Sequence, residues 1–197
     1  SVLTLAAVAG QFVGPRSKAF DASAFWRHAL ASAITARALA RAAALDEDQA
    51  FVAGLLHDVG LLAMSVYFPD ELDALLLHAR QADAELCSVE REHALTTHAE
   101  VGAWIAAHWH FPAVVERAIA AHHAPPAEPG AASGIAACVH VADAICHALD
   151  VTHLEHEQVP AIDPAAWRRV AMADEAFCRL FEETEDGVRA LCAALAL

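Results

Sequence analysis

The stretch FVAGLLHDVGLL, residues 51–62, places a His-Asp doublet, His57-Asp58, inside an otherwise apolar run with helical character. Gly54 and Gly60 flank the doublet. A carboxylate beside an imidazole is unfavourable in apolar surroundings unless it is hydrogen-bonded, ion-paired or bound to a metal. We therefore expect the doublet to have polar partners elsewhere in the chain.

Candidate partners for the doublet recur at wide intervals, each in a segment that is expected to be helical and bordered by small or apolar residues. They are His28 in FWRHALA, His98 in TTHAEVGAW, His122-His123 in IAAHHAP and Asp143 in CVHVADAIC. With the doublet, these five segments offer seven nitrogen and oxygen ligands. Such a set suits one or two borderline transition-metal ions better than zinc bound by thiolates.

The composition favours helix along most of the chain. Of 197 residues, 57% are hydrophobic and one is Tyr, and Ala and Leu are abundant. These features favour helices over strands, and the length is that of a single domain with a sizeable core. We expect an all-α helical bundle that forms one domain over residues 1–197.

Capping and proline signals predict where the helices begin. Asp21 or Ser23 caps the helix that carries His28, and Thr97 with Glu100 matches a capping box. The expected helical ranges are 1–13, 21 or 23 to 45, 46–67 with a bend at Gly60, 69–81, 88–95, 98–110, 112–123, 131–149, 164–172 and 174–195. The polar stretch 150–163 is expected to be a loop.

The charge balance limits the class of partner. The formal net charge is −14, and the twelve Lys and Arg residues form no basic stripe. This argues against binding to nucleic acid or to an anionic membrane surface. A bound metal ion would still make a local cationic site that is compatible with a phosphate-containing small ligand.

Cysteine usage and the N-terminal segment predict a cytoplasmic location. The five cysteines form no CxxC pair and are odd in number, which favours reduced and mostly buried thiols. Residues 1–14 are apolar but lack the basic region of a signal peptide and are too short to span a bilayer. With no initiator Met, the chain resembles an excised part of a longer protein. The cysteines are Cys87, Cys138, Cys146, Cys178 and Cys192.

The order of these residues resembles the HD superfamily of metal-dependent phosphohydrolases, and in particular the ligand series of the HD-GYP cyclic-di-GMP phosphodiesterases. The surrounding motifs WRHALASA, AFVAGLLHDVGLL, THAEVGAWIAAHW and FPAVVERAIAAHHAP are similar to the HDOD domain, the HD-related output domain of bacterial signalling proteins. The resemblance covers residues 1–149, so residues 150–197 would be a C-terminal helical extension. It implies an HD-domain-like bundle whose metal ligands are His28, His57, Asp58, His98, His122, His123 and Asp143.

Two departures from the HD-GYP pattern bear on activity. HD-GYP proteins carry a Lys three residues after the HD Asp and a Gly-Tyr-Pro loop after the paired histidines. This chain has Leu61 and the loop APPAEPG, residues 124–130. The first change removes a phosphate contact and the second removes part of a substrate wall, so both argue against cyclic-dinucleotide hydrolysis. HDOD domains also usually begin with several more helices.

Other polar and aromatic residues have simpler interpretations. Without the resemblance, a His on an apolar helix is more often a hydrogen-bonded core residue than a ligand. His140, Asp143 and His147 share a helical spacing that offers a local site, whereas the family geometry uses Asp143 alone. We expect the remaining histidines to lie at helix ends or in solvent, and the tryptophans to belong to the core. These are His78, His93, His108, His110, His153 and His156, and Trp26, Trp104, Trp109 and Trp167.

The first functional hypothesis is a bacterial signalling module. The helical bundle, with or without metal, would be an output or regulatory surface that works through signalling protein partners or further domains of the same polypeptide. The HDOD-like motifs, Leu61 and the missing Gly-Tyr-Pro loop favour this hypothesis.

The alternative is a metal-dependent phosphohydrolase similar to the cyclic-dinucleotide phosphodiesterases. His28, His57, Asp58 and Asp143 would hold one ion, and His98, His122 and His123 a second, with Asp58 bridging the two. Two closely spaced ions activate water and clamp phosphate oxygens. Histidine and aspartate ligands suit Fe, Mn, Ni or Zn.

Overall fold

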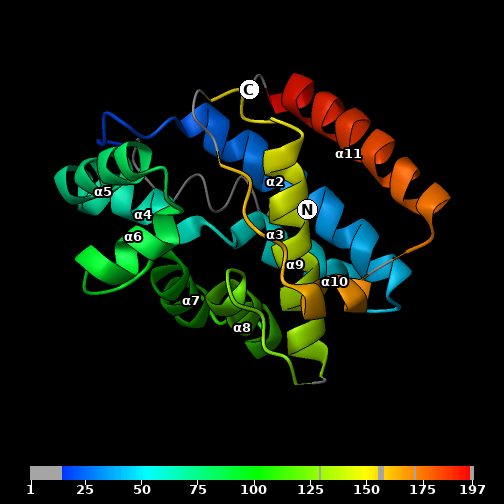
Figure 1. The fold of residues 1–197 in the computed structure, drawn as a ribbon. Helices are drawn as coiled ribbons and strands as arrows, with labels where there is room; N and C mark the ends of the chain where they lie inside the picture. Colours follow the sequence, from blue (N-terminus) through cyan, green and yellow to red (C-terminus); the bar gives the residue numbers. More distant parts are fainter. Residues whose placement is uncertain (1–14, 129, 155–157, 171, 196–197) are drawn as a thin grey trace.

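The computed structural model describes residues 15–128, 130–154, 158–170 and 172–195. Over these ranges the chain is helical and has no β-strand, which confirms the predicted all-α fold (Figure 1). The helices are α2 Ala22–Ala42, α3 Glu47–Leu56, α4 Val59–Tyr67, α5 Pro69–Ala82, α6 Leu86–His93, α7 His98–His108, α8 Ala113–Ala121, α9 Ala131–Ala148, α10 Pro164–Val170 and α11 Asp174–Leu195. The helix predicted for 1–13 lies outside the described residues.

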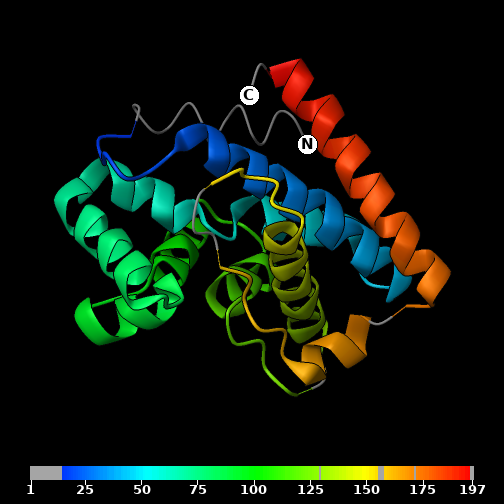
Figure 2. The same cartoon turned by 45° about the horizontal axis from the view of Figure 1, so that its top comes forward.

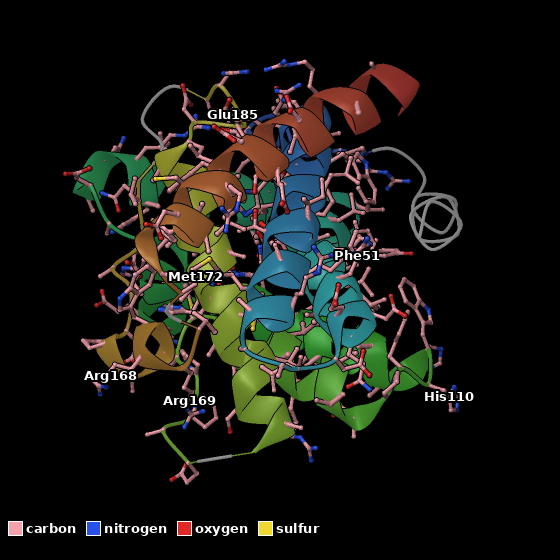
Figure 3. The ribbon with its side chains drawn as sticks, turned by 90° about the vertical axis from the view of Figure 1, so that its right-hand side faces the viewer. Phe51, His110, Arg168, Arg169, Met172 and Glu185 are labelled. Atoms are coloured by element: carbon pink, nitrogen blue, oxygen red, sulfur yellow. The ribbon has the colours of Figure 1, made fainter. Side chains whose placement is uncertain are left out.

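The main core forms around α2, which packs most extensively against α3 and α9. Helices α7 and α8 close this core from below α3, and α11 lies along α2 at the periphery (Figure 2). Figure 3 shows Phe51 on α3 beside α2, where the guanidinium carbon of Arg37 lies 4.1 Å from the centre of its ring. At the far end from α10, helices α4, α5 and α6 form a second apolar cluster that includes Leu72, Leu75 and Val89.

The predicted helix 46–67 is two helices, and the prediction of a bend at Gly60 is wrong. Helix α3 ends at Leu56 and α4 begins at Val59, so the break falls on the doublet itself. The side chain of Asp58 makes no capping hydrogen bond to α4, because its oxygens face histidines from other helices. The break thereby frees the Asp58 carboxylate for the interior of the bundle.

The two glycines that flank the doublet allow close helix contacts. A Cβ atom at Gly54 would lie 2.8 Å from the backbone oxygen of Ser32 on α2. A Cβ atom at Gly60 would overlap with the backbone carbonyl of His98 on α7. Both positions therefore require glycine for the doublet to approach α2 and α7 this closely.

Helix ends and local motifs agree largely with the sequence predictions. Asp21 caps α2 by accepting a hydrogen bond from the backbone N–H of Ala24, and the capping box of Thr97 and Glu100 is present at α7. Helix α8 is shorter than predicted, because it ends at Ala121 and the paired histidines follow it.

The predicted environments of the cysteines, the tryptophans and the histidines outside the ligand set are mostly confirmed. Cys87, Cys138 and Cys146 are buried free thiols, whereas Cys178 is exposed. The prediction that the tryptophans belong to the core is wrong for Trp104, which is 63% exposed. His78, His93 and His153 are exposed as expected; His156 and the side chain of Cys192 lie outside the described residues.

Two helical stretches are long and apolar enough to cross a membrane by length and composition alone. They are Glu47–Tyr67, which the break at the doublet divides, and Ala131–Ala148. Most of each stretch is buried inside the bundle, as expected for core helices of a globular domain.

Candidate metal centre

All seven predicted ligands converge inside the bundle, where they form two groups of donor atoms. The first group contains His28, His57 and Asp143, and the second contains Asp58, His98, His122 and His123. Within each group the donor atoms lie within 4.8 Å of one another. The seven residues come from α2, the α3–α4 junction, α7, the end of α8, and α9, so the site depends on the tertiary fold.

The first group is deeply buried. Nε2 of His28 lies 3.2 Å from Nε2 of His57 and 2.9 Å from Oδ1 of Asp143. Nε2 of His57 lies 3.7 Å from the same Asp143 oxygen. Two ligands of one ion, each bound at about 2.1 Å, lie no more than about 4.2 Å apart. These three donors are therefore close enough to share one ion.

The second group lies beside the first. Nε2 of His98 is 2.8 Å from Nε2 of His123 and 3.3 Å from Oδ1 of Asp58. Nε2 of His122 is 3.6 Å from that Asp58 oxygen. The other Asp58 oxygen, Oδ2, lies 3.2 Å from Nε2 of His57 in the first group. Each oxygen of Asp58 therefore faces a different group, as a bridging carboxylate would.

Backbone contacts orient two of the imidazoles toward the centre. Nδ1 of His57 lies 2.7 Å from the backbone oxygen of Gly54, and Nδ1 of His122 lies 2.7 Å from that of Ile119. A carbonyl oxygen only accepts, so Nδ1 carries the proton in both rings. In a neutral imidazole the opposite Nε2 then offers a lone pair to the cluster.

A metal ion fits the donors that are present. Nε2 of His122 is buried and has no hydrogen-bond partner among the described residues. A buried, unsatisfied acceptor is unfavourable, and a cation at the centre would satisfy it. Histidine nitrogens with carboxylate oxygens are a ligand set for divalent transition metals.

Electrostatics keep both carboxylates of the cluster ionised. Burial alone would raise the pKa of Asp58, but the charge and hydrogen bond of His57 and the hydrogen bond of His98 hold it well below its ordinary value. Burial would also raise the pKa of Asp143, but hydrogen bonds from His147 and His28 hold it well below its ordinary value.

The imidazoles of the second group differ in protonation. Burial and the neighbouring charge of His57 lower the pKa of His122 to about 3, and burial beside His122 lowers the pKa of His123. Burial alone would lower the pKa of His98, but hydrogen bonds with Asp58 and Glu90 raise it to about 10. Burial alone would lower the pKa of His57, but the charge of Asp58 and a hydrogen bond with Asp143 raise it well above its ordinary value. Neutral imidazoles and ionised carboxylates are the forms that ligate metals, so binding would release the protons that His57 and His98 carry.

Two residues near the centre were not among the predicted ligands. Glu90 on α6 is fully buried and lies 2.6 Å from Nδ1 of His98 through its Oε2 atom. His147 on α9 lies with its Nε2 3.2 Å from Oδ1 of Asp143. No sequence signal marked Glu90, whereas the spacing of His147 from Asp143 did suggest a local contact.

The local site suggested for His140, Asp143 and His147 forms only in part. Nδ1 of His140 donates to the backbone oxygen of His122, and its Nε2 accepts from the backbone N–H of Asp163. Through its two ring nitrogens His140 thus joins the segment after α8 to the loop ahead of α10. His140 is a structural residue in this arrangement.

A pocket of about 270 Å³ opens onto the cluster. Asp58, His98, His123 and Asp143 reach it from the two donor groups. Its other walls come from α4, α5, α6 and the segment after α9, and they are mainly apolar. Lining residues outside the ligand set include Leu61, Leu76, Arg80, Leu86, His147 and Leu154.

Several solved structures are similar to this chain. The chain resembles an HDOD domain protein from Geobacter sulfurreducens, with a TM-score of 0.75 and 23% identity over 90% of this chain and 64% of that one. The MmoQ response regulator from Methylococcus capsulatus str. Bath is 31% identical, with a TM-score of 0.65 over 85% of this chain and 64% of that one. This chain therefore spans about two thirds of the length of each.

A third similar structure is a protein from Shewanella amazonensis SB2B that is provisionally assigned as a phosphohydrolase. It is 19% identical, with a TM-score of 0.60 over 95% of this chain and 70% of that one, so it supports the fold alone. No curated protein gives a significant match. The family model of the HDOD domain matches residues 1–125, which is more than half of the sequence. The chain belongs to the HDOD domain family.

Proposed function

We propose that this chain is a metal-binding output or regulatory module of a bacterial signalling protein. In this proposal His28, His57, Asp58, His98, His122, His123 and Asp143 hold one or two divalent ions of Fe, Mn, Ni or Zn, with slow turnover of phosphoesters or none. The main observation in support of the metal site is the position of Asp58. One of its oxygens faces His57 in the first donor group, and the other faces His98 in the second.

The pocket beside the cluster supports a regulatory role. Leu61 lines it, where a Lys would offer a phosphate contact. Among the described lining residues, Arg80 is the one Arg or Lys, and the acids Asp83 and Glu85 also line the pocket. This charge pattern disfavours a ligand with several phosphates. The volume of about 270 Å³ is also below the usual range for drug-sized ligands.

The proposed partners follow from the family and the charge. An output module of this family would act on signalling proteins or on further domains of its own polypeptide in the bacterial cytoplasm. The formal charge of −14 makes nucleic acid and anionic membranes unfavourable partners. A small ligand with one phosphate remains compatible with the metal site and the single arginine in the pocket.

A second candidate function is phosphohydrolysis, and the contact of the pocket with both donor groups favours it. Bound ions would supply Lewis-acid activation of water and of a phosphate ester. The chain itself would hold the two groups together through Asp58, orient an anionic substrate with Arg80, and exclude water with Leu61 and Leu86.

Elemental analysis of protein purified without chelator tests the metal site. We expect one to two equivalents of transition metal, which are lost in the double variant His57→Ala with Asp58→Ala. The exposed His78 supplies a matched control, and His78→Ala should keep the full metal content. Absence of metal after reloading with Mn²⁺ or Fe²⁺ would overturn the proposed site.

A phosphatase assay of the metal-loaded protein separates the two functions. Bis(4-nitrophenyl) phosphate and cyclic dinucleotides serve as substrates, with the double variant as the blank. A rate of hydrolysis no higher than that of the double variant supports the regulatory module. Robust turnover that disappears in the double variant would instead establish the phosphohydrolase.

A further inference from the structure

Leucines from three helices line the pocket that opens onto the donor groups. Leu61 follows Asp58 by three residues on α4, and its backbone N–H donates to the backbone oxygen of Asp58. Leu76 on α5 and Leu86 on α6 are the other two. All three are partly buried and pack against the second apolar cluster, which holds them in place. The pocket therefore joins the donor groups to an apolar wall.

A fourth leucine comes from the segment that follows α9. Leu154 lines the same pocket and is 38% exposed. In that segment, Nε2 of Gln158 donates to Oδ1 of Asp83 at the end of α5 over 2.6 Å. This hydrogen bond ties the segment to the helix that carries Leu76. Apolar surface in the pocket is thus left partly open to water, and covering it with an apolar ligand is favourable.

Other features of the lining narrow the class of ligand. The described lining residues include no Phe, Tyr or Trp, on which nucleobases commonly stack. The lining histidines are already engaged, because His98 and His123 belong to the second donor group and His147 contacts Asp143. Arg80 is the one described Arg or Lys in the lining. The pocket therefore suits an aliphatic body with one phosphate better than a nucleobase or several phosphates.

We propose that this pocket binds a phosphate monoester with a short aliphatic chain. The phosphate lies at the ions of the donor groups, and the chain lies against the four leucines. The inference rests on the proposed metal-binding function, because the ionised Asp58 and Asp143 would repel a phosphate without bound cations. It adds the class of ligand that the metal site takes. The volume of about 270 Å³ limits the chain to a few carbons.

The experiment is isothermal titration calorimetry of Mn²⁺-loaded protein with a series of phosphates. The probes are inorganic phosphate and methyl, ethyl, propyl and butyl phosphate. Burial of each methylene strengthens binding about fourfold. We therefore expect butyl phosphate to bind about 60-fold more tightly than methyl phosphate, with a plateau once the chain fills the pocket.

Two leucine variants test where the chain lies. Leu76→Ala and Leu154→Ala should each weaken binding of butyl phosphate by about fivefold or more and leave binding of inorganic phosphate unchanged. Leu77 is next to Leu76 on α5, is 56% exposed and is not among the described residues that line the pocket. Leu77→Ala is therefore the matched control and should bind every probe as wild type does. Leu154 lies outside both apolar clusters, so Leu154→Ala preserves the test if Leu76→Ala does not fold.

The remaining outcomes each contradict something specific. Equal affinities for methyl and butyl phosphate would overturn the inference, as would tighter binding of adenosine or guanosine monophosphate than of butyl phosphate. Protein that holds Mn²⁺ but binds none of the phosphates would also overturn it, while leaving the proposed metal-binding function intact. Protein that holds no Mn²⁺ would overturn both. Elemental analysis of each titrated sample distinguishes the last two results.

Discussion

Glu90 contacts the ring nitrogen of His98 opposite the one that faces Asp58. Its side chain is fully buried, and its Oε2 atom also accepts a hydrogen bond from the backbone N–H of His98. Around metal-bound histidines, a carboxylate at this position fixes the ring orientation and makes the opposite nitrogen more basic. Glu90 therefore supports the second donor group from α6.

Replacing Glu90 by Gln should weaken metal binding by about tenfold or more, because the neutral amide does less to raise the basicity of His98. Chelator competition with Mn²⁺ measures the change. Glu92 on the same helix has a side chain that is 75% exposed, so Glu92→Gln is the matched control and should bind as wild type does. Equal affinities for the two variants would mean that Glu90 does not support the site.

The sequence predicted which seven side chains converge, because histidines and aspartates are conspicuous in apolar helical segments. Glu90 could not be found this way, since Arg91, Glu92 and His93 beside it are exposed charged or polar residues of the same short helix. Its burial depends on how α6 packs against α7, which residue types do not reveal. His147 was visible in the helical spacing, but the family pattern gave no reason to choose it.

At the scale of helices, the apolar run across residues 51–62 predicted one continuous helix, and the structure contains two. No proline marks the break. It occurs because Asp58 contacts His98 from α7, while Nδ1 of His57 donates to the backbone oxygen of Gly54. Helix starts at Asp21 and Thr97 were predictable, because capping acts within a few residues of sequence.

Helix α5 is joined to the segment before α2 by Asp73, and this link should depend on pH. The hydroxyl of Ser17 donates to Asp73, as do the backbone N–H groups of Ala19 and Lys18. The Ser17 hydrogen bond and then that of Ala19 lower the pKa of Asp73 from its ordinary value. The unfolded pKa is about 3.9, so the stabilisation is present above that pH and is lost as pH falls through the lower folded pKa.

Urea unfolding of wild type and Asp73→Asn from pH 7 to pH 2.5 measures this link. We expect wild type to be the more stable at pH 7, and the difference in unfolding free energy to shrink below about pH 4. The exposed carboxylate variant Glu92→Gln should show no comparable change. A difference that stays constant down to pH 2.5 would mean that ionisation of Asp73 does not stabilise the link.

At the scale of the whole molecule, the candidate centre joins most of the bundle. Its donors come from α2, the junction of α3 with α4, the start of α7, the end of α8, and α9. Without a cation, two ionised carboxylates and several imidazoles occupy the interior of a protein with a formal charge of −14. The fold class and the seven residues that converge were predictable from sequence, but their division into two groups depends on the packing of these helices.

Metal removal should therefore destabilise the whole domain. A ligand that binds only the folded state at 100 times its Kd stabilises it by about 2.7 kcal/mol. For a domain of this size, that corresponds to a fall in Tm of about 5 to 10 °C on chelation. Differential scanning calorimetry of wild type with Mn²⁺ and with chelator measures the shift. Asp58→Asn removes the charge shared by both groups, so its Tm should respond little to either addition. If chelation left the wild-type Tm unchanged, the seven residues would be a polar core that is stable without metal. The stability of the bundle would then come from apolar packing around α2, α3 and α9.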